Sequence, residues 1–221
     1  MHHLTPEQQA ISREIVRWWE ALQPDEADYG KRVQRFGPFA ALGRADRAQL
    51  RRCRQRDEVL LLAGFHRLAH VLGKLDGVSI ARDDEGGGRA ILLSDLALTV
   101  AVLTHAEHKP GAEFAKSLGS KNDAGRVPMS ELRFQQLQTC RDEDMFFRQA
   151  RRAVDLLRGK VDVGLLALDL LQWLQEYRQP DALPPQKRLK LRWASAYYQA
   201  SFAEDADTEA LPTDTLAGDT K

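Results

Sequence analysis

Apolar residues recur along most of the chain at the three- and four-residue spacing of an α-helix. The first such helix is predicted to begin at Thr5-Pro6, a capping residue followed by a first-turn proline, and to end at Pro24. Its apolar face comprises Ile11, Ile15, Trp18, Trp19 and Leu22. No segment alternates apolar and polar residues for long enough to predict a β-strand, so we expect an all-α protein.

Glycine and proline divide this pattern into separate elements. After a second, basic segment that runs to Phe36, helices are predicted over residues 43–53, 57–72, 91–106, 113–118, 130–139, 142–158, 163–177 and 185–202. The glycine-rich residues 76–89 are predicted to form a flexible loop. Lys109-Pro110-Gly111 is the best candidate boundary between two small helical bundles, 1–110 and 111–202, joined by a short linker. The acidic residues 203–221 are predicted to be a disordered tail.

Charge is segregated along the chain, although its formal total is zero. Between Lys31 and Lys74, eleven Lys or Arg residues stand against three acids, whereas after Phe202 six acids stand against one Lys. A basic body with an acidic tail differs physically from an evenly mixed surface, because the body can attract a polyanion. A neutral total therefore does not exclude a nucleic-acid partner.

Cysteine content and the start of the chain indicate a cytosolic protein. The start, MHHLTPEQQ, has no basic region followed by an apolar stretch, and no run approaches the ~18 apolar residues of a membrane span. Cys53 and Cys140 are too few for a disulfide framework or a zinc ribbon. We expect both to be reduced, half-buried thiols.

The most informative segment is an arginine stripe that begins after Gly43. On a helix, positions i, i+3, i+7 and i+10 of this segment are Arg44, Arg47, Arg51 and Arg54. Only one acid, Asp46, lies within the stretch, and like charges at helical spacing cost about 0.2–0.5 kcal/mol per pair. Such a stripe suits a polyanion, since the arginine fork donates two parallel hydrogen bonds to phosphate. The alternatives are a solvated charged face or arginines paired with acids from another helix.

A second basic face is predicted in the C-terminal half. In the helix over 142–158, the apolar face comprises Phe146, Ala150, Ala153, Val154 and Leu157. Arg148 and Arg152 lie opposite this face, and Arg151 lies on its flank with Arg158, while Arg141 precedes the helix. The polar loop before it is surrounded by Lys116, Lys121, Arg126 and Arg133. Loops of this composition often contact phosphates, although a solvated loop is the alternative.

Few residues suggest catalysis. Asp142, Glu143 and Asp144 occupy a first helical turn, where they complement the helix dipole, and adjacent positions diverge by about 100° and cannot converge on one metal ion. His66 and His70 have metal-ligand spacing but no evident third ligand. We therefore predict no catalytic residue, no metal and no cofactor. A helical nuclease built on the carboxylates near Asp142 is the enzymatic alternative.

Histidines and aromatic residues near helix ends admit two interpretations. His105 and His108 end a predicted helix, where partial positive charge is favourable. In the last helix, Arg192-Trp193 and Tyr197-Tyr198 lie near three basic residues, Lys187, Arg188 and Lys190. Basic and aromatic side chains together can stack on unpaired bases. The alternative is that these aromatic rings dock the helix on the protein.

Six stretches, in this order, resemble the CasB family, the small subunit of the type I-E CRISPR surveillance complex (Cascade). They are Ala48–Cys53 with Asp57–Val59 and Phe65–Leu68, Phe114–Leu118 with Gly125–Val127, Glu131–Leu137, Phe147–Val154, Leu170–Trp173, and Arg192-Trp193 with Tyr197-Tyr198. The likeness covers roughly residues 12–200, and the acidic tail and the loop 76–89 depart from the family pattern.

The resemblance implies two helical bundles without catalytic activity. It further implies a head-to-tail pair of copies that lies against the guide-RNA-bound backbone subunits and the large subunit of the complex. The basic surface of such a subunit stabilises opened target DNA, especially the displaced strand, and helps to hold the R-loop, whose formation is a near-balanced exchange. The alternative is a scaffold subunit whose arginines pair with acids on sister subunits rather than with DNA.

Residues that match the family pattern are predicted to contact nucleic acid. By this resemblance they are Arg51, Arg52, Lys116, Arg126, Arg133, Arg148, Arg151 and Arg152. Spacing alone, without the family pattern, adds Arg44, Arg47, Lys121 and Arg141.

Overall fold

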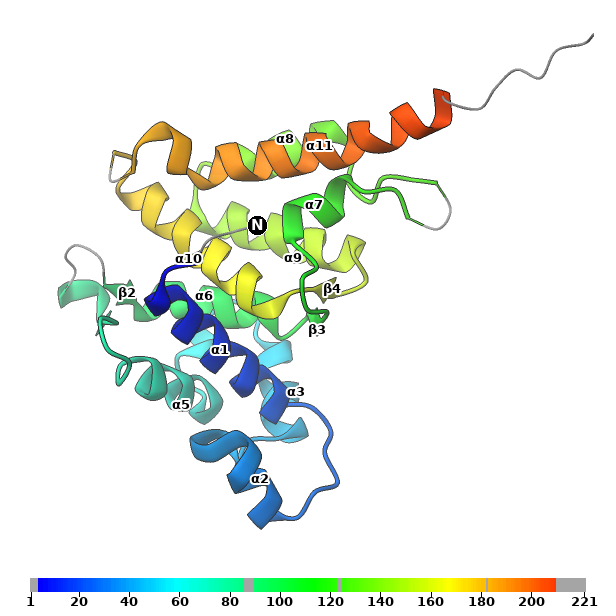
Figure 1. Cartoon of the computed structure of the whole chain (residues 1–221). Helices are drawn as coiled ribbons and strands as arrows, with labels where there is room; N and C mark the ends of the chain where they lie inside the picture. The colour runs from blue at the N-terminus through cyan, green and yellow to red at the C-terminus, as the bar shows by residue number, and fades with distance from the viewer. Residues whose placement is uncertain (1–3, 86–89, 123–124, 182, 210–221) are drawn as a thin grey trace, which may run out of the picture.

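The computed structural model describes residues 4–85, 90–122, 125–181 and 183–209, and it is built almost entirely of helices. The N-terminal half contains α1 (Pro6–Ala21), α2 (Tyr29–Phe36), α3 (Arg44–Arg52), α4 (Arg56–Val59), α5 (Ala63–Leu72) and α6 (Leu93–Leu103). The C-terminal half contains α7 (Phe114–Gly119), α8 (Glu131–Gln138), α9 (Glu143–Leu156), α10 (Val163–Arg178) and α11 (Leu189–Glu209). The predicted all-α class is confirmed (Figure 1).

Side-chain caps begin the helices where the sequence places them. The Thr5 hydroxyl accepts from the Gln8 backbone N–H, and the Gln8 side chain accepts from the Thr5 N–H, which completes a capping box at α1. The Asp142 carboxylate accepts from the Met145 N–H at α9, and Asp162 caps α10 in the same way. These local signals fix three helix starts without help from the rest of the fold.

The prediction of one continuous helix over 57–72 is wrong, because the helix is interrupted between α4 and α5. Leu62 has an extended backbone, and its neighbour Leu61 is 83% exposed. The break lets Val59 and Phe65, on either side of it, both become fully buried. A continuous helix would have buried Leu61 or exposed one of these two, and the energy of burial outweighs helical propensity.

Four two-residue strands, which the sequence does not predict, form two parallel pairs within the described residues. The strands are β1 (Ile80–Ala81), β2 (Ile91–Leu92), β3 (Glu107–His108) and β4 (Lys160–Val161), paired β1 with β2 and β3 with β4. The predicted loop 76–89 therefore holds β1 and a 3-10 turn at Asp83–Glu85, and its residues 86–89 lie outside the described part. Two residues are too short to leave an alternating pattern.

The last helix is longer than predicted. After a 3-10 turn at Pro185–Lys187, α11 continues to Glu209, so the helix includes residues 203–209 at the start of the predicted tail. No glycine or proline interrupts the sequence from Leu189 to Glu209, and acidic residues do not by themselves end a helix. Residues 210–221 of the predicted tail lie outside the described residues.

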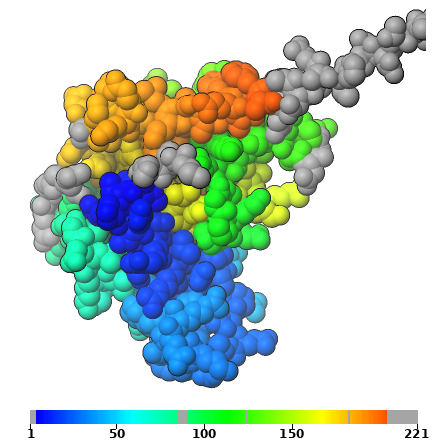
Figure 2. Space-filling view, viewed as in Figure 1, coloured from blue at the N-terminus to red at the C-terminus, as the bar shows by residue number. Residues whose placement is uncertain are grey.

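The two halves of the chain share one hydrophobic core. Buried residues from α1, α5 and α6 and from α8, α9 and α10 belong to a single cluster. α1 approaches α10 so closely that a Cβ on Gly164 would lie 2.1 Å from the Ser12 hydroxyl oxygen. Figure 2 shows the segments around α2 and α3 at the narrow end of the molecule and α11 along the opposite side. The division into bundles 1–110 and 111–202 stays a prediction.

The predicted linker and the residues just before it are held in place by hydrogen bonds from their backbone N–H groups. The Glu107 N–H donates to the Gly159 carbonyl at 2.7 Å, and the Lys109 N–H donates to the Val161 carbonyl at 2.8 Å. The Gly111 N–H donates to an Asp162 carboxylate oxygen at 2.8 Å. The chain between α6 and α7 is therefore tied to the connection between α9 and α10.

Candidate nucleic-acid interface

The arginine stripe of α3 is shorter and less uniform than its spacing predicts. Arg44, Arg51 and Arg52 are exposed, but Arg47 is half-buried, with its guanidinium carbon 5.9 Å from the centre of the Trp19 ring. Arg54 lies beyond the helix, which ends at Arg52. The stripe therefore presents its outer arginines to solvent and rests Arg47 against the core.

The second basic face lies on α9, with the orientation that the sequence predicts. Ala150 and Val154 are fully buried, whereas Arg148 and Arg152 are exposed on the opposite side of the helix. Arg151 on the flank is half-buried, and its guanidinium carbon lies 5.4 Å from the centre of the Phe147 ring. The apolar face of α9 thus packs against the core, and Arg148 and Arg152 face solvent.

Nearly all the predicted contact residues lack a polar partner for their side chains. Within the described residues, no ion pair or side-chain hydrogen bond is made by Arg44, Arg47, Arg51, Arg52, Lys116, Arg126, Arg133, Arg141, Arg148, Arg151 or Arg152. Lys121 is half-buried and does have an interaction partner. By contrast, Arg32 pairs with Asp25 and also donates to three backbone carbonyls. Pairing with acids from another helix therefore does not explain the stripes.

Helix α6, which the turn containing His105 follows, contacts both basic helices, α3 and α9. His105 lies in this turn, and burial, followed by the positive charges of Arg151, Arg51 and Arg47, lowers its pKa to about 4. Asp155 acts in the opposite direction and does not outweigh them. The sequence suggests a favourable positive charge at this helix end, but burial, reinforced by the nearby arginines, keeps the imidazole neutral at pH 7. Sequence spacing misses this convergence, because α3 and α9 lie far apart in the chain.

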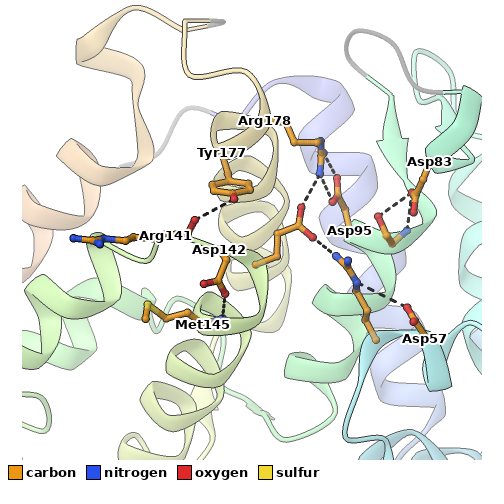
Figure 3. A network of polar contacts seen from close by, with 11 residues as sticks. Asp57, Asp83, Asp95, Arg141, Asp142, Met145, Tyr177 and Arg178 are labelled. Carbon is orange, nitrogen blue, oxygen red and sulfur yellow. Dashed lines mark hydrogen bonds and ion pairs between the residues drawn. The ribbon is translucent and has the colours of Figure 1, made fainter.

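The other predicted residues lie on segments outside α3 and α9. Lys116 is exposed on α7, Arg126 is exposed in the loop that follows, and Arg133 is exposed on α8. In Figure 1, α7 lies beside α11, whereas α3 lies near the C-terminal end of α1. Arg141 is exposed just before α9, and its carbonyl accepts a hydrogen bond from the Tyr177 hydroxyl (Figure 3).

The aromatic residues of α11 dock the helix. Trp193 is 3% exposed, and its Nε1 donates to the Asp169 carboxylate at 2.8 Å. Tyr197 is 3% exposed, donates to the Met129 carbonyl at 2.7 Å, and stacks on Phe134 with ring centres 4.0 Å apart. Burial therefore excludes Trp193 and Tyr197 from stacking on bases, and the docking interpretation is correct for both.

The acids at the start of α9 diverge, as their spacing predicts. Asp142 caps the helix, whereas Glu143 pairs with both Arg56 of α4 and Arg178 of α10. Arg178 also forms a two-pronged pair with Asp95 of α6, as Figure 3 shows. This four-residue network joins four helices, and no local pattern predicts it. Among the described residues, no group of three or more His, Cys, Asp or Glu could hold a metal ion.

The two cysteines are free and buried, more fully than the half-buried thiols that we expect from the sequence. Burial, followed by the negative charge of Asp142, raises the pKa of Cys140 to about 11. Burial, followed by the charge of Glu58, also raises the pKa of Cys53. Both groups therefore stay protonated at neutral pH, and a thiolate nucleophile is disfavoured at each.

Among the described residues, no helix combines the length and the apolar composition that a membrane span requires.

Comparisons with known proteins agree on one family. Residues 46–198 match the sequence model of the family described as CRISPR-associated protein Cse2. The fold resembles a crystal structure of a Cse2-family CRISPR-associated protein from Thermus thermophilus, with 22% identity, a TM-score of 0.50, and coverage of 89% of this chain and 100% of that one. It also resembles CasB from Thermobifida fusca, with 19% identity, a TM-score of 0.52, and coverage of 88% and 99%.

At such identities the two structures support the fold alone, and no curated protein matches the sequence. The family assignment rests on the sequence match, which extends over more than half of the chain and includes most of α3, all of α9 and part of α11. This protein belongs to the Cse2 (CasB) family of CRISPR-associated proteins.

Proposed function

We propose that this protein is the non-catalytic small subunit of a type I-E CRISPR ribonucleoprotein complex in the cytoplasm, and that its basic faces bind nucleic-acid backbone. In that complex it stabilises the R-loop and above all the displaced DNA strand. Its partners are a second copy of itself, the guide-RNA-bound backbone subunits and the large subunit. The family match supports the CRISPR context, and the surface of α3 and α9 supports the binding role.

The observation that carries the proposal is the set of arginines without an acidic partner. Arg51 and Arg52 on α3 and Arg148 and Arg152 on α9 are exposed, and none forms an ion pair within the described residues. Uncompensated like charges repel one another, and a phosphate backbone relieves that repulsion while releasing counterions. Phosphate contacts are indifferent to sequence, which suits a subunit that must accept any target.

The test is the binding of purified protein to labelled single-stranded and double-stranded DNA over a salt series. We expect salt-sensitive binding, and we expect the double variant Arg148→Ala/Arg152→Ala to reduce the slope of log K against log salt by about 1.4 on single strands, or ~0.7 per lost phosphate contact. Both side chains lie on the solvent side of α9, so the fold should change in stability by no more than about 0.5 kcal/mol.

A matched control removes the same charge from arginines that have acidic neighbours. Arg13 lies 3.6 Å from Glu14 and Arg35 lies 3.7 Å from Glu20, and their side chains are 74% and 63% exposed. The control Arg13→Ala/Arg35→Ala should leave the slope unchanged. Equal losses in both double variants would contradict a defined interface and indicate attraction by net charge alone.

Two further outcomes would replace the proposal. If DNA does not bind even at low salt while the protein still assembles with its sister subunits, the arginines act as a protein–protein scaffold. If DNA is cleaved when magnesium is added, the protein is a nuclease.

A further inference from the structure

A hollow of about 360 Å³ lies on the surface where α8 meets α9. Its lining comes from the end of α8, the connection between the helices and the first turns of α9, and comprises Gln136, Thr139, Arg141, Met145 and Gln149. All of these residues except the half-buried Gln149 are exposed, so a ligand can enter from solvent. Pockets for small organic ligands have volumes of about 300–1,000 Å³, so the hollow is large enough for one nucleobase.

The polar side chains of this hollow are available to a ligand. Within the described residues, the side chains of Gln136, Gln149 and Arg141 form no hydrogen bond or ion pair. Arg141 is engaged only through its carbonyl, which accepts from the Tyr177 hydroxyl. Each glutamine amide offers donors and an acceptor, and the guanidinium offers donors and a positive charge. The hollow therefore presents hydrogen-bonding groups that the fold does not use.

Met145 supplies an apolar surface beside these groups. Its side chain is 37% exposed. In Figure 3 this side chain and that of Arg141 extend to the same side of the start of α9, away from Arg178 and Asp95. A thioether is polarizable and makes favourable contacts with aromatic rings. An unpaired base presents a ring face and a hydrogen-bonding edge, and the hollow offers a complement to both.

Arginines without acidic partners border the hollow. Arg148 and Arg152 follow Met145 by three and seven positions on α9, and Arg133 lies one turn before the hollow on α8. All three are exposed, and none forms an ion pair within the described residues. Asp142, the acid nearest to Arg141 in sequence, accepts from the Met145 N–H. This charge suits a ligand that carries phosphates next to its bases.

We propose that this hollow, the α8–α9 pocket, binds one unpaired nucleobase of a single strand, while the bordering arginines contact its phosphates. The α8–α9 pocket rests on the proposed function and adds to it a site that distinguishes single strands from duplexes. In a duplex the Watson–Crick edge is paired and both ring faces are stacked, so no base is free to enter. Every base carries donors and acceptors on that edge, and a glutamine amide can turn to match either, so the pocket accepts any sequence.

The experiment compares the affinity of the full chain for two labelled single strands of equal length, an oligothymidylate and an oligonucleotide of abasic sites, over a salt series. Both strands carry the same phosphates, so only the bases differ. One hydrogen-bonded base contact strengthens binding about fivefold, so wild-type protein should prefer the oligothymidylate by about that factor. The variant Met145→Ala/Gln149→Ala should lose the preference and keep the salt slope, because it removes no charge.

A matched control changes an apolar residue and a glutamine on another helix. Leu191 and Gln199 are both exposed on α11, and Leu191→Ala/Gln199→Ala should keep the preference. Circular dichroism verifies that each variant is folded. Salt-sensitive binding with equal wild-type affinity for the two strands would overturn the α8–α9 pocket, leave the proposed function standing, and favour a sister subunit as the occupant of the hollow. Absence of any DNA binding would overturn both.

A second measurement does not depend on a variant. Of the three methionines in the sequence, Met129 is 2% exposed and Met145 is 37% exposed. With isotope-labelled methionine methyl groups, the NMR signal of Met145 should shift upfield on addition of the oligothymidylate, because the methyl group then lies against a base ring. The signal of Met129 should stay in place. An equal response of Met145 to the abasic strand would overturn the α8–α9 pocket.

The unpaired base could belong to the displaced DNA strand or to the guide RNA, and an oligouridylate of the same length separates these sources. A larger Met145 shift and tighter binding with the oligothymidylate would support the pocket as a site for the displaced strand. A larger shift and tighter binding with the oligouridylate would support it as a site for RNA. No shift with either strand, although both bind, would overturn the pocket.

Discussion

The network that joins α4, α6, α9 and α10 should make a large contribution to stability, and Arg178→Met tests it. Asp95 is buried, with 3% of its side chain exposed, and its carboxylate receives both prongs of the Arg178 guanidinium. Methionine keeps the aliphatic volume and removes the charge. The variant leaves Asp95 without its partner and takes from Glu143 one of its two arginines, since Arg56 remains.

The magnitude follows from the burial of the two partners. Removal of one member of a buried pair typically costs 3–5 kcal/mol, and 29% exposure of the Arg178 side chain places the expected cost near the lower end, at about 3 kcal/mol. Burial, which outweighs the stabilising effect of Arg178, already raises the pKa of Asp95. Loss of the arginine raises it further, so the orphaned carboxyl gains a proton more readily as pH falls.

Urea unfolding followed by circular dichroism measures the effect. A raised folded-state pKa of a carboxyl favours the folded state below that pKa, so the deficit of Arg178→Met should be complete at pH 7.5 and smaller at about pH 5. The variant Asp95→Asn instead removes the negative charge of the pair. The double variant Arg178→Met/Asp95→Asn should be more stable than the sum of the two single changes predicts, by about 2 kcal/mol.

Two results would refute this reasoning. A cost below about 1 kcal/mol for Arg178→Met would place the pair among solvated surface bridges. Strict additivity in the double variant would show that the two side chains do not act on each other.

Three further predictions concern other parts of the molecule. Gly119→Ala should destabilise the protein by about 1–3 kcal/mol, because the alanine Cβ would lie 2.3 Å from the Tyr197 carbonyl oxygen. Thermal unfolding measures this, and an unchanged melting temperature would contradict the close approach of α7 and α11. Cys140, whose pKa is about 11, should react with iodoacetamide far more slowly at pH 7.5 than a free thiol, and the reaction should become faster on denaturation. Mass spectrometry detects the label, and rapid labelling of the native protein would contradict the raised pKa. Truncation of residues 203–221, which carry six acids and one Lys, should strengthen DNA binding at low salt and have little effect at high salt; equal affinities at low salt would show that this acidic segment does not compete for the basic faces.

Local sequence signals predict much of the fold. Thr5 and Asp142 begin their helices by capping, and the spacing of Ala150 and Val154 fixes which side of α9 is buried and therefore that Arg148 faces solvent. These features depend on residues within one or two helical turns, so periodicity and capping chemistry suffice to read them. The resemblance to the CasB family likewise rests on local stretches, and the Cse2 family match confirms it.

Only the tertiary structure decides which residues meet. Arg178 and Asp95 are 83 positions apart, and the arginines whose charges lower the pKa of His105 come from α3 and α9, which have no common sequence pattern. The packing of apolar faces sets these positions, and many sequences can supply equivalent apolar faces, so no residue spacing records the outcome. The sequence by itself determined most of the helices and their charged sides; the fold decided that Arg47 rests on Trp19, that Arg54 leaves its helix, and that α6 contacts two basic helices far apart in the chain.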